Sequence, residues 1–197
     1  MSATTQNLPE QDRLRQLFIG AMGAVATGVT VVATGGAGGQ FAQTVSAMSS
    51  VSADPPLLLV CLNSRSPINA AISANGVLTV NVLGRQHDHV ADTFAGRPWP
   101  GKEPWDFTCG EWVDAPSGAP WISDAIARFD CAVHDVVRAG SHLVVIGRVV
   151  EVGSDPGEPL IYSAQTYAKP VPVAPSVFPE YPGSGPIRRT TTKENTK

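Results

Sequence analysis

The stretch that decides the fold is residues 44–63, which reads TVSAMSSVSADPPLLLVCLN. Its first half is apolar but rich in small hydroxyl residues, which let a flat ligand approach the backbone and can donate hydrogen bonds to it. Asp54-Pro55-Pro56 then forces a turn or a rigid break, because proline fixes φ and lacks an N–H group. The apolar run 57–62 follows at once and predicts a buried strand. Two strands that meet at this break could hold a ring system between them.

Outside this stretch the sequence predicts mostly strands, separated by turns. We expect strands at residues 28–34, 40–46, 77–83, 125–137 and 142–152, and a last ordered piece at 160–167. We expect helices at residues 12–23, 66–75 and 85–94, the first capped by Asp12 and the second by Ser66. Residues 96–120, with three tryptophans, show no clear period and are interpreted as a long surface excursion. Strands and helices do not alternate regularly, which favours an antiparallel β-barrel with helices on its outside.

Length and composition narrow the class of protein. The 197 residues predict one domain, with residues 12–168 folded and with 1–11 and 170–197 as flexible tails or a dimer arm. A net charge of −3 gives no basic face for nucleic acid and no basic patch for a membrane. Only 16% of the residues are charged, which favours an oligomer. With no signal peptide and no apolar run long enough for a membrane span, we expect a cytoplasmic protein with free cysteines.

Local motifs that resemble known sites are mostly weak. The glycines at 35–39 precede a predicted strand, whereas a phosphate loop must open a helix. The three cysteines lack zinc-site spacing, so no metal site is predicted, and Cys61 is interpreted as a buried structural thiol. His87 and His89 lie two residues apart on a predicted helix, where they point to different sides, so a solvated helix face is favoured.

Two further positions keep two interpretations open. The helix start at Ser66-Pro67 could hold a phosphate with the hydroxyls of Ser64 and Ser66, although an ordinary N-cap is favoured by the local sequence. His142 follows a predicted hairpin turn, where most histidines are surface residues. It gains a functional role only if the tip of that hairpin overhangs a pocket.

The order of several segments resembles the short-chain flavin reductases, the reductase components of two-component flavin-dependent monooxygenases. The segments are ATGVTVV (26–32), TVSAMSSVS (44–52), DPPL (54–57), NVLG (81–84), FAGR (94–97), GSH (140–142) and IGRV (146–149). The resemblance covers roughly residues 14–167. It implies a mainly β fold, the FMN-binding split β-barrel with a few short flanking helices, usually as a homodimer.

The resemblance also implies an NAD(P)H:flavin oxidoreductase that reduces FMN or FAD with NADH or NADPH and supplies reduced flavin to a partner monooxygenase. The implied cofactor-binding residues are Thr44, Val45, Ser46, Ala47 and Met48 at the flavin ring and ribityl chain, Cys61, Leu62 and Asn63 beside them, Ser64 and Ser66 at the phosphate, and Asn81. His142 is the implied catalytic residue, near the nicotinamide.

Two positions depart from the family pattern. Ser141 stands where the family usually has aspartate, and Met48 stands where an aromatic residue is common. Two other functions therefore stay open at this point. One is a protein that keeps its flavin bound and reduces another acceptor, and the other is a non-enzymatic split barrel that binds flavin or haem.

Overall fold

The computed structural model describes residues 10–172. Its elements are α1 (Glu10–Gly23), β1 (Thr27–Gly28), β2 (Thr30–Thr34), β3 (Phe41–Val45), β4 (Met48–Ala53), β5 (Pro56–Asn63), α2 (Ile68–Asn75), β6 (Val77–Val82), the 3₁₀ turn η1 (Arg85–His87), α3 (Asp88–Phe94), β7 (Trp112–Asp114), β8 (Pro120–Ile122), β9 (Ala127–Ala139), β10 (His142–Gly153), β11 (Ile161–Ser163) and β12 (Thr166–Ala168). None of the helices in this part of the chain is long and apolar enough to cross a membrane.

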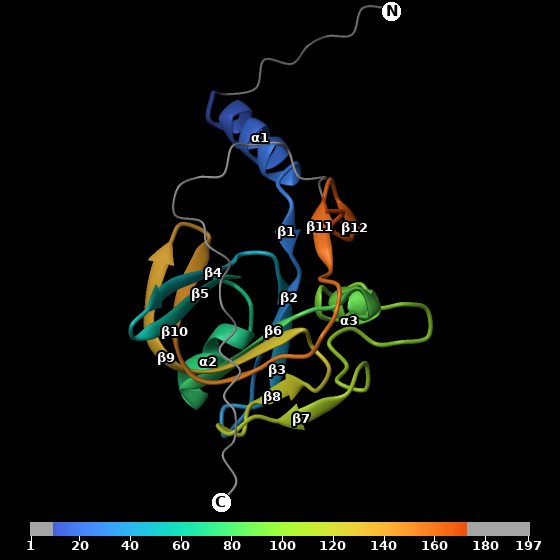
Figure 1. The fold of residues 1–197 in the computed structure, drawn as a ribbon. Coiled ribbons are helices and arrows are strands. Elements are labelled where there is room, and N and C mark those ends of the chain that lie inside the picture. Colours follow the sequence, from blue (N-terminus) through green and yellow to red (C-terminus); the bar gives the residue numbers. More distant parts are fainter. Residues whose placement is uncertain (1–9, 173–197) are drawn as a thin grey trace, which may run out of the picture.

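Seven antiparallel strands form the main sheet, in the order β3-β2-β6-β9-β10-β5-β4 (Figure 1). Its two edge strands, β3 and β4, are consecutive in the chain and are joined only by Ser46 and Ala47. Three Cα–Cα steps span at most about 11 Å, whereas seven strands laid flat would separate the edges by roughly 29 Å. The sheet must therefore curl until its edges approach each other. We call the Ser46-Ala47 link, where the two edges meet, the seam.

Local sequence explains most of these elements. The expected hairpin of β2 and β3 forms, with Thr30 opposite Val45, and a two-residue turn at Gly140 and Ser141 joins β9 to β10. Gly140 has a φ of 57°, which glycine adopts without a steric penalty. The mainly β fold with flanking helices expected from the sequence is confirmed.

The core lies on both faces of the sheet in two clusters. One contains Val32, Val60, Leu62, Ile72 and Leu78 and is covered by α2. The other is centred on Phe94 of α3, whose ring meets those of Phe107 and Trp112 edge-on at centroid distances of 5.1 and 5.4 Å. The 96–120 segment is thus only partly the surface excursion that the sequence suggests, since it supplies aromatic rings to the core and contains β7.

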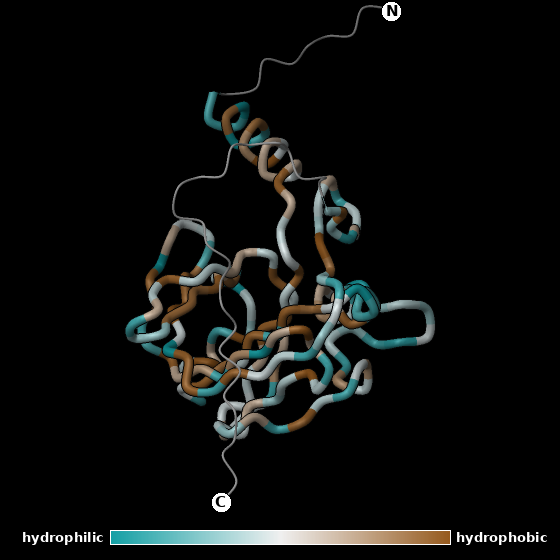
Figure 2. The backbone as a smooth tube through the Cα atoms, viewed as in Figure 1, coloured by the Kyte–Doolittle hydropathy of each residue, from teal (hydrophilic) through white to brown (hydrophobic). Residues whose placement is uncertain are grey.

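Helix α1 is an exception, because it buries none of its residues. It stands apart from the main sheet (Figure 1), and its hydrophobic residues are visible as brown segments in Figure 2. Its exposed apolar side chains are Leu14, Leu17, Phe18, Ile19 and Met22.

Candidate functional site

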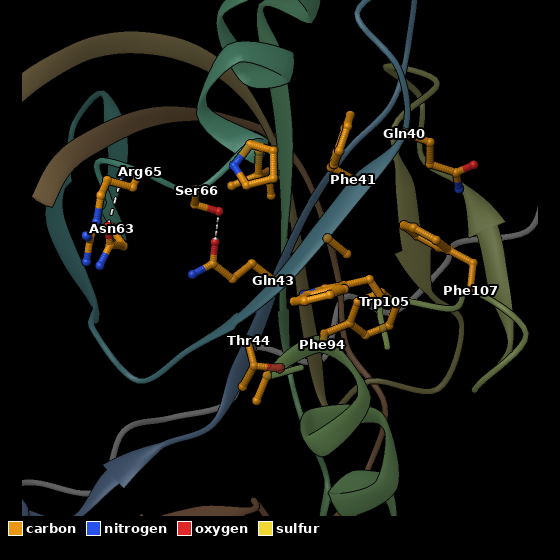
Figure 3. Close-up of a pocket in the computed structure, with 14 residues that line it drawn as sticks. Gln40, Phe41, Gln43, Thr44, Asn63, Arg65, Ser66, Phe94, Trp105 and Phe107 are labelled. Atoms are coloured by element: carbon orange, nitrogen blue, oxygen red, sulfur yellow. Dashed lines mark hydrogen bonds between the residues drawn. The ribbon is translucent and has the colours of Figure 1, made fainter. Parts of the chain in front are cut away.

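A cavity of about 700 Å³ opens between β3, the loop from β5 to α2, and the 96–120 segment. Figure 3 shows Asn63, Arg65 and Ser66 on one side and Trp105 and Phe107 on the other. One end of the cavity is therefore polar and cationic, and the opposite end is aromatic. This combination suits a ligand that carries both an anionic group and a flat ring.

Hydrogen bonds among its own side chains and backbone organise the polar end. The Ser66 hydroxyl donates to Gln43 Oε1, and Asn63 Oδ1 accepts the Arg65 N–H at 3.0 Å. Ser66 does not cap α2 as the sequence suggests, because the cap position is Pro67 and no side chain caps the helix. Asn69 Oδ1 is buried without a partner among residues 10–172, although its amide N–H₂ donates to Asn63 O at 2.7 Å. Asn69 does not line the cavity, so this unpaired acceptor lies behind the polar end.

A smaller hollow of about 180 Å³ adjoins the cavity, because Thr44 and Ala95 line both. Its other lining residues include Ser46 of the seam and Arg97. The Thr44 hydroxyl donates to Ala91 O at 2.7 Å, so it joins β3 to α3 and does not point to a ligand as a free donor.

The seam brings part of the predicted flavin segment together with part of β5. Cys61 N–H donates to Ala47 O at 3.0 Å, which places Ala47 beside the middle of β5. Ser46 and Ala47 are exposed, and neither donates its own N–H to another backbone group in the described chain. Small residues with free N–H groups at the meeting point of two sheet edges fit the close approach of a flat polar ring.

The remaining predicted residues of this region divide between core and surface. The side chains of Val45 and Leu62 are buried in the core, and Met48 packs against the same cluster, so these residues can offer a ligand little more than their backbone. Cys61 is a half-buried free thiol, and Ser64 donates its N–H to Ser141 O at 3.0 Å. Of the two residues predicted at the phosphate, Ser66 lines the cavity and Ser64 does not, and Asn63, predicted beside the flavin ring, also lines it.

Asn81 was predicted from the NVLG motif to bind the cofactor, but the structure places it in the core. Its side chain is fully buried, donates to Val31 O at 3.1 Å and accepts the Ile122 N–H at 2.8 Å. Asn81 therefore joins β2, β6 and β8, and does not line the cavity.

His87 was predicted to lie on a solvated helix face, and this prediction is wrong. Residues 85–87 form a 3₁₀ turn and not the first turn of α3, which rotates His87 inward until it is 3% exposed. Its Nδ1 accepts the Gly84 N–H at 3.2 Å, and its Nε2 lies 3.0 Å from Asp124 Oδ1.

His142 is exposed at the tip of the β9–β10 hairpin and does not line the cavity. It pairs with Asn63 across the β10–β5 ladder, so the tip adjoins the polar end. The Ser141 hydroxyl lies 2.9 Å from His142 Nδ1. Ser141 thus supplies a hydrogen-bonding partner to the ring, although it is not the aspartate usual in the family.

Asp92 is the centre of a group of contacts that no sequence motif indicated. The Tyr167 hydroxyl donates to Asp92 Oδ1 at 2.8 Å, and the Trp99 indole donates to Oδ2 at 3.2 Å. Arg97 Nη2 lies 3.7 Å from Oδ1. Burial, assisted by the hydrogen bond to Asp92, raises the pKa of Tyr167 well above its usual value, so the phenol stays protonated. These residues come from segments about 70 positions apart, and only the fold brings them together.

Comparisons with known proteins agree with this geometry. The family model described as "Flavin reductase like domain" matches residues 22–170. The chain is 42% identical to the FMN reductase (NADH) RutF of Methylorubrum extorquens over 158 residues, which cover 79% of this chain and 74% of that one.

Two solved structures share the fold along most of their length. BorF, the flavin reductase component of a bacterial two-component tryptophan halogenase, superimposes with a TM-score of 0.70 at 32% identity, covering 79% of this chain and 97% of BorF. The NADH:FAD oxidoreductase SgcE6 of Streptomyces globisporus gives a TM-score of 0.72 at 30% identity, covering 86% and 99%. The match over residues 22–170 and the shared fold show that the chain belongs to the flavin reductase-like domain family.

Proposed function

We propose that this protein is an NADH-dependent flavin reductase that reduces free flavin and releases it to a partner monooxygenase. The observation that carries the proposal is the adjacency of the seam to a cavity whose polar end contains Arg65 and Ser66. The relatives support the donor and the partner class, since one is named an NADH-dependent FMN reductase and another is the reductase of a two-component halogenase.

The residues present fit a flavin. The N–H groups of Ser46 and Ala47 are free to meet the polar edge of the ring. The Arg65 side chain makes no ion pair within residues 10–172, so its guanidinium is available for a phosphate. Bound flavin would supply the redox chemistry by accepting a hydride from the nicotinamide. The protein contributes position, hydrogen bonds and exclusion of water.

His142 is proposed to orient the nicotinamide. Ser141 Oγ can donate to Nδ1, which leaves the proton of a neutral imidazole on Nε2, where it can donate to the carboxamide of the nicotinamide. The role is binding and orientation, because the hydride passes without a protein acid or base.

The test of the function is an anaerobic mixture of the full chain with FMN and NADH, in which flavin bleaching and nicotinamide oxidation are both followed. We expect multiple turnovers with free FMN. A flavin that copurifies and reacts only once would instead indicate a bound flavoprotein with another acceptor, and no bleaching would contradict the proposal.

In the same assay His142→Ala should raise the KM for NADH about tenfold, with less than about a twofold change in flavin affinity. An unchanged KM for NADH would show that His142 does not bind or orient the nicotinamide.

The homodimer expected for this family is proposed to form through α1. The helix exposes Leu17 and Phe18 at 60% and 63%, and a second copy of the chain would cover this apolar surface. Light scattering after size-exclusion chromatography should give twice the chain mass of 20.6 kDa. The double variant Leu17→Asp/Phe18→Asp should give the monomer mass, whereas Gln16→Asp on the same helix should remain dimeric. A monomeric wild-type chain would contradict this assembly.

A further inference from the structure

The three tryptophans of the 96–120 segment have different surroundings. The Trp112 indole donates to Cys109 O at 2.9 Å, and its ring packs in the core. The Trp99 indole donates to Asp92. Trp105, by contrast, forms no aromatic pair and donates no indole hydrogen bond within residues 10–172, and 58% of its surface is exposed. The fold itself makes little use of this ring.

The backbone nevertheless holds Trp105 in a costly conformation. Its φ is 58°, in the left-handed region that a bulky residue rarely adopts. The other non-glycine residues with positive φ in the described chain, Ala164 and Gln165, form the turn between β11 and β12, where such angles are usual. The Trp105 N–H donates to Thr93 O at 3.1 Å, which ties the strained residue to the end of α3.

Gly96 leaves the space that the Trp105 ring occupies. A Cβ atom on Gly96 would lie 3.0 Å from Cζ2 of the indole. The ring therefore lies against Gly96 at the aromatic end of the cavity, opposite Arg65 and Ser66 (Figure 3). A strained backbone and an exposed ring that has no aromatic or hydrogen-bonding partner in the described chain together indicate that the ring serves a ligand.

We propose that Trp105 stacks on the adenine ring of FAD and so sets the ratio of this chain's affinities for FAD and FMN. The inference rests on the proposed flavin reductase function. FAD carries an adenosine monophosphate joined directly to the flavin phosphate, and the cavity that offers Arg65 and Ser66 for phosphate also contains the Trp105 ring. A flat purine stacks well on an indole. NADH also contains adenine, but its adenosine is joined to the nicotinamide and not to the flavin phosphate.

The first experiment compares the affinities for FAD and FMN by flavin fluorescence titration. Trp105→Ala should weaken FAD binding about tenfold or more and change FMN binding by less than about twofold. Trp105→Phe, which retains a ring, should restore much of the FAD affinity. Trp99→Ala, on the same segment but outside the cavity, should leave the ratio of the two affinities unchanged. An equal loss for both flavins would place the ring on the flavin itself and overturn the proposal, as would no loss for either.

A second variant distinguishes the loss of the ring from a loss of the fold. Trp105→Gly removes the ring but adopts a positive φ freely, so its Tm should equal or exceed that of the wild type. Its FAD affinity should fall as far as that of Trp105→Ala. Retained FAD affinity in a folded Trp105→Gly protein would overturn the proposal.

A third measurement does not depend on reductase activity. Calorimetric titration of ADP into the flavin-free full chain should show binding to the wild type and none to Trp105→Ala. The KM for NADH with FMN as acceptor should be the same in both proteins, and an increase in the variant would assign the ring to NADH and overturn the proposal. Absent ADP binding with intact FMN reduction would refute this inference alone, whereas absent flavin reduction with intact ADP binding would refute the proposed function.

Discussion

Ser46→Trp is expected to abolish flavin binding while the stability of the fold stays close to that of the wild type. Ser46 is exposed at the seam and lines the hollow next to the cavity, so an indole there would occupy the space proposed for the flavin ring. The backbone between β3 and β4 would not need to move, because the new side chain points into open space. We expect the Kd for FMN to rise about a hundredfold or more.

The measurement is a flavin fluorescence titration together with a thermal melt of each variant. Ser49→Trp is the matched control, since Ser49 is also an exposed serine, three residues further along in β4, and does not line the hollow. The control should bind FMN as the wild type does. Intact FMN affinity in Ser46→Trp would show that the flavin ring lies elsewhere.

Asn81→Ala is expected to lower the free energy of unfolding by about 2–4 kcal/mol. The substitution leaves the buried Ile122 N–H without its acceptor and removes a donor from Val31 O. Urea denaturation followed by circular dichroism measures the change. The folded fraction should bind FMN normally, because Asn81 does not line the cavity.

Thr79→Val is a comparison within the same network, because Thr79 is also fully buried in β6, donates to Pro120 O at 2.5 Å and accepts a hydrogen bond from Asn81 Nδ2 at 3.3 Å. It should cost about 1 kcal/mol. A loss of FMN affinity in Asn81→Ala with an unchanged free energy of unfolding would contradict this structural role. It would support the role in cofactor binding that the sequence suggested.

Hairpins and short helices could be predicted because their signals are local. The β-branched run before Gly35 and the strand from residue 41 determine one hairpin, and the apolar alternation on both sides of Gly140 determines another. His87 was mispredicted for a related reason. A 3₁₀ turn and the first turn of an α-helix have nearly the same sequence pattern, but they point the third side chain in different directions.

The positions of most strands along the chain and, through the hydroxyl-rich segment 44–52 and the other motifs, the family could be predicted from the sequence alone. The folded structure settles which of the side chains predicted to bind flavin remain accessible. The Thr44 hydroxyl donates to Ala91 O of α3, Ser46 remains exposed at the seam, and Asn81 is buried between strands. The physical reason is that a side chain's surroundings depend on pairings between distant segments. Ser46 and Ala47 become a seam only because the sheet closes over seven strands, and Trp105 faces the cavity only because Thr93 and Gly96 hold it there.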